Sequence, residues 1–126
     1  MITPDLHESV LKRDGYTCQL RGPHCEGRGY QVAHILFGDR KGKHTAKDIR
    51  DWVDQEWNLA AACHSCNVGT RSDKGPEARE AHIRRMLKLD KAGFLNWDFR
   101  RPPELRDEQI HRMIGLALEG EPHDLE

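Results

Sequence analysis

No stretch of this 126-residue chain approaches the run of about 18 consecutive apolar residues that a membrane-spanning helix requires. The first ten residues, MITPDLHESV, also lack the basic segment followed by an apolar segment that marks a secretory signal. We therefore expect a cytoplasmic protein that does not bind membranes. Thiols stay reduced in that compartment, which favours metal binding over disulfides.

The chain also has few apolar residues and almost no net charge. Hydrophobic residues make up 37% of the chain and charged residues 33%, which leaves little material for the core of so small a domain. Another interaction is therefore expected to stabilise the fold, and four cysteines could supply it as two disulfides or as one metal site. The net charge of −1 does not by itself indicate a nucleic-acid-binding protein.

Apolar periodicity and capping residues predict an α+β chain. Thr3-Pro4 is expected to begin an N-terminal helix that Asp14-Gly15 ends. The segments QVAHILF at 31–37 and LAAA at 59–62 predict two short strands, and a helix is expected to follow from His64.

Other helices are expected between the strands and after them. Between the strands, Thr45-x-x-Asp48 resembles the capping box of a short helix. Residues 77–91 and 104–118 predict two C-terminal helices, separated by Pro102-Pro103. We divide the chain into a core at 1–75 and a helical extension at 76–126, which either packs on the core or dimerises.

The four cysteines stand in two pairs, Cys18-x6-Cys25 and Cys63-x2-Cys66. The tight second pair is typical of a zinc knuckle, in which a turn leading into a helix presents two thiolates to one ion. Four thiolates make a closed tetrahedral site, so we predict a structural Zn²⁺, with unpaired buried thiols as the alternative. Two histidines adjoin cysteines and could replace a ligand, although each is interpreted as a bystander: His24 and His64.

Three polar residues stand close to this predicted knuckle in the sequence. His34 lies inside the apolar strand segment, Asn58 directly precedes the second strand segment, and Asn67 directly follows the last cysteine. A metal site that joins a hairpin to a helix would bring all three near one point. For each, the alternative is structural: a hydrogen-bonded strand histidine, a turn asparagine and a helix cap.

Residues 10–74 carry four landmarks in order, RDGYTCQ, AHI, NL and CHSCN. Together they resemble the HNH endonuclease family, in particular its short zinc-bound members common in phages and bacteria. The resemblance covers about half of the chain. It implies a ββα-metal, treble-clef-like core bound to zinc.

The resemblance also implies roles for the polar residues. His34 would be the general base that activates water against a DNA phosphodiester, nicking or cutting the duplex. Asn58 would orient His34 or its loop through the side-chain amide. Asn67 would bind Mg²⁺ or Mn²⁺ through its carbonyl oxygen, and that ion would stabilise charge on the phosphate and the leaving oxygen.

One position departs from the family pattern. The residue before the catalytic histidine is usually a metal ligand in the family, and here it is Ala33, which has no ligand atom. A substitute ligand could come from Asp39, His44 or Asp73. The alternative is a catalytically inactive, zinc-stabilised DNA-binding or scaffold protein.

A local surplus of positive charge follows the first strand segment. Residues 39–50 contain five Lys or Arg and only two Asp. This local excess of positive charge indicates either a phosphate-binding loop or a solvated loop. We expect DNA as the partner, with a homodimer or a phage packaging protein as further partners. The residues expected to hold the DNA backbone are Arg40, Lys41, Lys43, Arg71 and Lys74.

Overall fold

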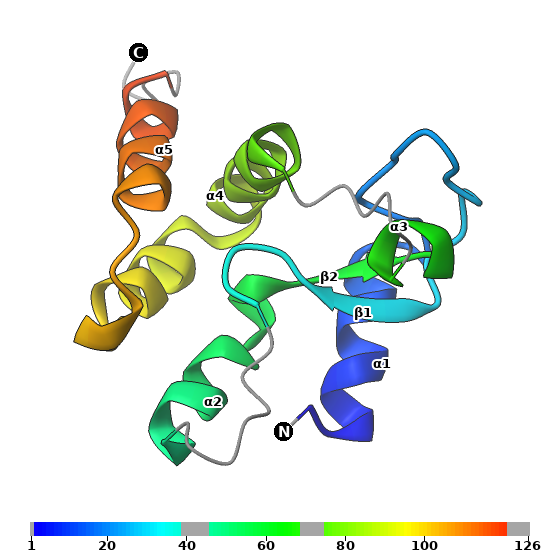
Figure 1. The fold of residues 1–126 in the computed structure, drawn as a ribbon, viewed down its shortest axis with the longest axis horizontal. Coiled ribbons are helices and arrows are strands. Elements are labelled where there is room, and N and C mark those ends of the chain that lie inside the picture. Colours follow the sequence, from blue (N-terminus) through cyan, green and yellow to red (C-terminus); the bar gives the residue numbers. More distant parts are fainter. Residues whose placement is uncertain (1, 39–45, 69–74, 121–126) are drawn as a thin grey trace.

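The computed structural model describes residues 2–38, 46–68 and 75–120 (Figure 1). These residues form an α+β structure with five α-helices and a two-stranded sheet. No helix in these three ranges is both long and apolar enough to span a membrane. In chain order the elements are α1 (Pro4–Arg13), β1 (Gln31–His34), α2 (Lys47–Val53), η1 (Glu56–Asn58), β2 (Leu59–Ala62), α3 (His64–Val68), α4 (Pro76–Phe99), η2 (Pro103–Leu105) and α5 (Glu108–Glu119).

Helix α1 begins where its capping residue predicts. The Thr3 hydroxyl accepts a hydrogen bond from the Leu6 N–H at 3.1 Å, and Pro4 occupies the first turn, where its missing N–H is no loss. Val10 and Leu11 are buried on the inner face. The helix contacts both strands, so its amphipathic face covers the small sheet.

The two strands form an antiparallel hairpin, in which Gln31 pairs with Ala62 and His34 pairs with Leu59. The second strand has its expected bounds, and its four residues are all buried. The first strand ends at His34, although the apolar run continues to Phe37. The chain bends there because the backbone N–H groups of the next residues bond the side chain of Asn58.

Helix α2 starts at Lys47, within the segment expected to be helical. Its N-cap residue is Ala46, which makes no side-chain capping bond. Thr45, the first residue of the expected capping box, lies outside the described residues. Trp52 and Val53 are buried and attach α2 to the core.

The C-terminal helices differ from the expected bounds. Helix α4 continues past residue 91 to Phe99, with non-helical dihedral angles at Asp90 (φ −160°, ψ 83°). The Asp90 carboxylate accepts a hydrogen bond from the Gly93 N–H at 3.0 Å, so it caps a second helical segment after the kink. Helix α5 begins at Glu108 rather than at residue 104, because Asp107 caps it and η2 precedes it.

Two tryptophans fasten the second half of α4 to α2. The rings of Trp52 and Trp97 stack with centroids 4.1 Å apart. Each indole N–H donates to the backbone carbonyl of the other tryptophan, at 2.9 and 3.0 Å. Trp52 is therefore a core residue. Figure 1 shows α4 between the hairpin and α5.

A buried carboxylate links α1, β2 and α4. Asp14 accepts hydrogen bonds from Arg13 (2.9 Å), Arg85 (2.5 Å) and the Ala61 N–H (2.8 Å), and its side chain is fully buried. Burial alone would raise the pKa of Asp14, but the hydrogen bond from Arg13 and the other contacts lower it. Arg85 is therefore part of a structural ion pair.

Helix α4 also carries a buried histidine that should make the fold sensitive to acid. The His82 Nε2 atom lies 2.7 Å from the Trp57 carbonyl, and burial lowers the pKa of His82 from 6.5 to about 3. Between pH 6.5 and about pH 3, His82 is protonated in the unfolded chain but stays neutral in the folded chain. Stability should therefore fall as the pH drops below about 6.5, by up to about 1.4 kcal/mol per pH unit.

The replacement His82→Gln tests this contribution, because glutamine can keep the donor and does not titrate. Urea unfolding at several values between pH 4 and 7 should give a shallower loss of stability in the variant than in the wild type. The other titratable side chains are the same in both proteins, so the difference in slope reports the contribution of His82. Parallel slopes would contradict the prediction.

Candidate functional site

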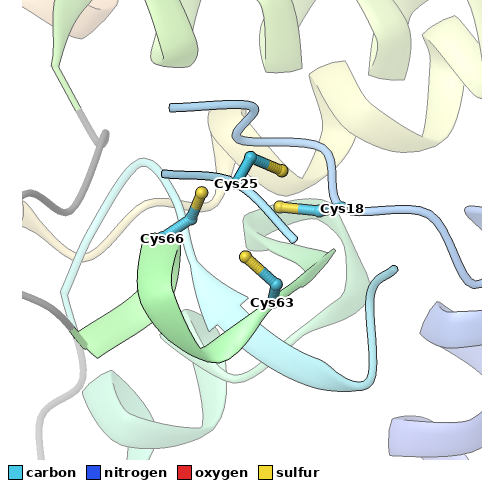
Figure 2. A group of neighbouring side chains, drawn as sticks. All are labelled: Cys18, Cys25, Cys63 and Cys66. Atoms are coloured by element: carbon cyan, nitrogen blue, oxygen red, sulfur yellow. The ribbon is translucent and has the colours of Figure 1, made fainter. Parts of the chain in front are cut away.

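The four cysteines gather into one cluster (Figure 2). Cys18 and Cys25 come from the loop between α1 and β1, Cys63 directly follows β2, and Cys66 lies in α3. Their sulfur atoms all lie within 4.8 Å of one another. Zinc–sulfur bonds of about 2.3 Å place the sulfurs of a tetrahedral site roughly 3.8 Å apart, so this group could hold a metal ion such as zinc.

Backbone N–H groups surround the sulfurs. Gly22 donates to Cys66 at 3.4 Å, Glu26 donates to Cys63 at 3.4 Å, and the Gly27 N–H lies 3.3 Å from the sulfur of Cys25. Gly27 has a φ of +87°, a region that glycine enters without steric cost. The loop thus supplies the partners that stabilise negative charge on thiolates.

The thiols of the cluster differ in acidity. Burial would raise the pKa of Cys18, but hydrogen bonds from backbone N–H groups, first that of Arg21, lower it to about 7. Burial raises the pKa of Cys66 to about 12, and the neighbouring thiols add to this effect. Because the pKa of Cys66 is raised, its thiol keeps its proton at neutral pH, and binding of a metal ion to this thiolate would release that proton.

Neither adjoining histidine belongs to the cluster. His24 is exposed, and the group of clustered ligand atoms contains only the four sulfurs. The Nδ1 atom of His64 instead lies 3.0 Å from Nε2 of Gln31. Both histidines are therefore bystanders, as the sequence predicts.

His34, the predicted general base, ends β1 and pairs with an acid that the sequence did not reveal. Its Nε2 atom lies 2.7 Å from a carboxylate oxygen of Asp54, the C-cap residue of α2. The two side chains are only 12% and 13% exposed. Burial of Asp54 would raise its pKa, but the hydrogen bond with His34 lowers it, so the carboxylate is ionised at neutral pH. The only signal for this partner in the sequence is that Asp54 directly follows two apolar residues, Trp52 and Val53, at the end of α2.

Asn58 is fully buried, and its amide makes four hydrogen bonds with the backbone. Its oxygen accepts from the N–H groups of Leu36 and Phe37, both at 2.9 Å. Its nitrogen donates to the carbonyls of Phe37 and Val53, both at 2.8 Å. Asn58 therefore orients the loop after His34 and joins it to the end of α2.

Asn67 lies in α3 and contacts β1 through another amide. Its Nδ2 atom donates to Oε1 of Gln31 at 3.0 Å. This contact places Asn67 beside the first residue of β1, whereas His34 is the last. The start of α3 is held by Glu26, whose carboxylate accepts from the N–H and hydroxyl of Ser65 at 3.2 and 3.1 Å.

Ala33, which stands where the HNH endonuclease family usually has a metal ligand, is 1% exposed and belongs to the hydrophobic core. Within residues 2–38, 46–68 and 75–120, no second group of three or more His, Cys, Asp or Glu side chains gathers as a metal site. The remaining candidates lie outside the described residues: the substitute ligands Asp39, His44 and Asp73, and the basic residues Arg40, Lys41, Lys43, Arg71 and Lys74.

An open cavity of about 310 Å³ adjoins Asp54 and is lined by Leu6, Asp51, Asp54, Gln55 and Glu56. Its three carboxylates disfavour binding of a free anion in this cavity.

No protein-family model, curated protein or solved structure matches the chain.

Proposed function

We propose that this chain is an HNH-type endonuclease that hydrolyses phosphodiester bonds in DNA, with His34 as its general base. The observation that carries the proposal is that only one of the two ring nitrogens of His34 is hydrogen-bonded within the described residues. Nε2 is held by Asp54 at 2.7 Å, and Nδ1 has no hydrogen-bond partner among the described residues. A neutral imidazole in this arrangement has one nitrogen able to accept a proton from water.

The local architecture supports the same proposal. An antiparallel hairpin leads through Cys63 directly into a short helix, and His34 ends the first strand. This order of two strands, a thiol pair and a helix is compatible with a zinc-bound ββα-metal, treble-clef-like core. The four thiolates would hold Zn²⁺ in a closed structural site, which leaves no position for a reacting water.

A catalytic Mg²⁺ or Mn²⁺ ion finds little support in the described residues. Of the predicted oxygen ligands, they contain only Asn67, and the buried Ala33 supplies none. These residues alone do not make a site for a hard cation, which prefers about six oxygen ligands. We therefore assign no step to this ion, and we treat a metal requirement as a question for the assay.

The experiment is a nicking assay on supercoiled plasmid with Mg²⁺, Mn²⁺ or EDTA, comparing the wild type with His34→Ala. The wild type should give relaxed or linear DNA, and His34→Ala should reduce the rate by about 10² to 10⁴-fold, the usual contribution of a general base. His111→Ala is the matched control, because His111 is exposed on α5, away from the hairpin. It should cleave as the wild type does.

The outcomes separate an enzyme from a binding protein. Product that disappears in His34→Ala alone supports the nuclease. No product from the folded wild type under any of the metal conditions contradicts it. Equal cleavage by both proteins indicates a contaminating nuclease and removes His34 from the mechanism.

One observation favours a second function, a zinc-stabilised DNA-binding or scaffold protein that cleaves nothing. The position of the usual metal ligand is a packed alanine, not an open site awaiting a side chain. Such a protein would bind DNA equally with Mg²⁺ or EDTA. In that case Arg40, Lys41, Lys43, Arg71 and Lys74 would contact phosphates, and the affinity should fall steeply as the salt concentration rises.

A further inference from the structure

The pair of His34 and Asp54 joins two elements that are distant in the sequence. His34 is the last residue of β1, and Asp54 caps the C-terminus of α2, twenty residues later. Both side chains are largely shielded from water, so their 2.7 Å contact is weakly screened. Exposed ion pairs contribute little and vary in geometry, but a shielded and short contact holds a ring in one orientation.

The chemistry of a carboxylate decides which ring nitrogen carries the proton. An ionised Asp54 can only accept a hydrogen bond, so Nε2 of His34 must donate. The neutral ring is then unprotonated at Nδ1. When Nδ1 takes a proton from water, the adjacent carboxylate stabilises the resulting imidazolium charge.

Asn58 fixes the two halves of this pair relative to each other. It bonds the N–H groups of Leu36 and Phe37, which follow His34. It also donates to the carbonyl of Val53, which precedes Asp54. In addition, the Ile35 N–H donates to the backbone carbonyl of Asn58 at 2.9 Å. One buried residue therefore links the segment after β1 to the end of α2 through its side chain and its backbone.

We infer that Asp54 is the positioning residue for His34: its carboxylate holds the ring, keeps the proton on Nε2 and leaves Nδ1 as the proton acceptor. This inference rests on the proposed function of His34 as a base. Asp54 itself touches no reacting atom and acts only through the ring. A residue that merely attached α2 to the hairpin would affect stability but would not select a tautomer.

The first test is ¹⁵N NMR of the full zinc-loaded chain, which reads the protonation of each ring nitrogen without any substrate. In the wild type near neutral pH, His34 should be protonated at Nε2 and not at Nδ1. Asp54→Asn keeps an acceptor oxygen and should retain this tautomer. Asp54→Leu removes the acceptor and should give averaged ring signals. An Nδ1-protonated wild type, or an unchanged ring in Asp54→Leu, would overturn the inference.

The second test is kinetic and uses Asp51→Asn as the matched control. Asp51 also lies on α2 and lines the same cavity, but its side chain is 48% exposed and pairs with Lys47. Asp54→Leu should lower kcat at least about 10-fold with KM unchanged. The kcat of Asp54→Asn should lie between those of Asp54→Leu and the wild type. The kcat of Asp51→Asn should equal that of the wild type.

The two tests keep the two proposals apart. If the wild type cleaves and Asp54→Leu loses only thermal stability, with kcat per folded molecule unchanged, Asp54 is a structural partner and the inference fails. If the wild type does not cleave DNA, the proposed function fails. The NMR result then still decides whether Asp54 sets the state of the His34 ring.

Discussion

Replacing Cys63 with serine should abolish metal binding and unfold the hairpin with its flanking loop. Cys63 links β2 to α3, and its sulfur lies within 4.8 Å of the other three. Binding of structural zinc is worth about 10–16 kcal/mol in small zinc-dependent domains. A small domain is stable by only about 5–15 kcal/mol in total. Loss of one of four thiolates should therefore remove most of the stability of the fold.

The measurement is metal content by mass spectrometry together with a thermal melt followed by circular dichroism. The wild type should hold one zinc per chain and lose its cooperative melt when a strong chelator removes the ion. Cys63→Ser should behave as the chelated wild type does. His24→Ala is the control, since His24 neighbours Cys25 in sequence but lies outside the cluster. A cooperative melt of Cys63→Ser near the wild-type temperature would refute the prediction.

Replacing Asn58 with alanine should cost about 4 kcal/mol or more of unfolding free energy. The side chain is fully buried and satisfies two N–H groups and two carbonyls of the backbone. Leaving one such buried group unpaired costs about 1–3 kcal/mol, and water cannot reach this position without disrupting the core. The same change should release the loop after His34 from the end of α2.

Urea denaturation of the zinc-loaded protein measures this effect. Gln55→Ala is the control, because Gln55 lies in the same connection but is exposed. It should shift the unfolding free energy by less than about 0.5 kcal/mol. If Asn58→Ala also shifts it by so little, the four hydrogen bonds are not structural. In the folded fraction of Asn58→Ala, the His34 ring signals should broaden, because the contact with Asp54 is no longer held in place.

The sequence predicted the elements whose signals are local. The cap at Thr3 is set by one hydroxyl near its own helix, and the bounds of β2 by four apolar residues between Asn58 and Cys63. The cysteine cluster could also be predicted, because the spacing of Cys63 and Cys66 is typical of a turn that presents two sulfurs to one ion. A local pattern constrains these features whatever the rest of the chain does.

Predictions were wrong where a tertiary contact changed the local preference. The apolar run to Phe37 favours a longer strand, but Asn58 takes up the N–H groups that would have continued the ladder. The helical pattern stops near residue 91, yet α4 resumes after its kink. There Gly93 lies so close to Trp57 that an added Cβ would come within 2.6 Å of the indole ring.

The sequence by itself determined the α+β composition, the hairpin, the cysteine cluster and the candidacy of His34. Only the tertiary structure decided that Asp54 is the partner of His34, that Asn58 joins their two segments and that Ala33 is enclosed in the core. The physical reason is sequence distance. The hydrogen bonds that define the site join residues twenty or more positions apart, or depend on packing between elements, and no local pattern encodes which pairs will meet.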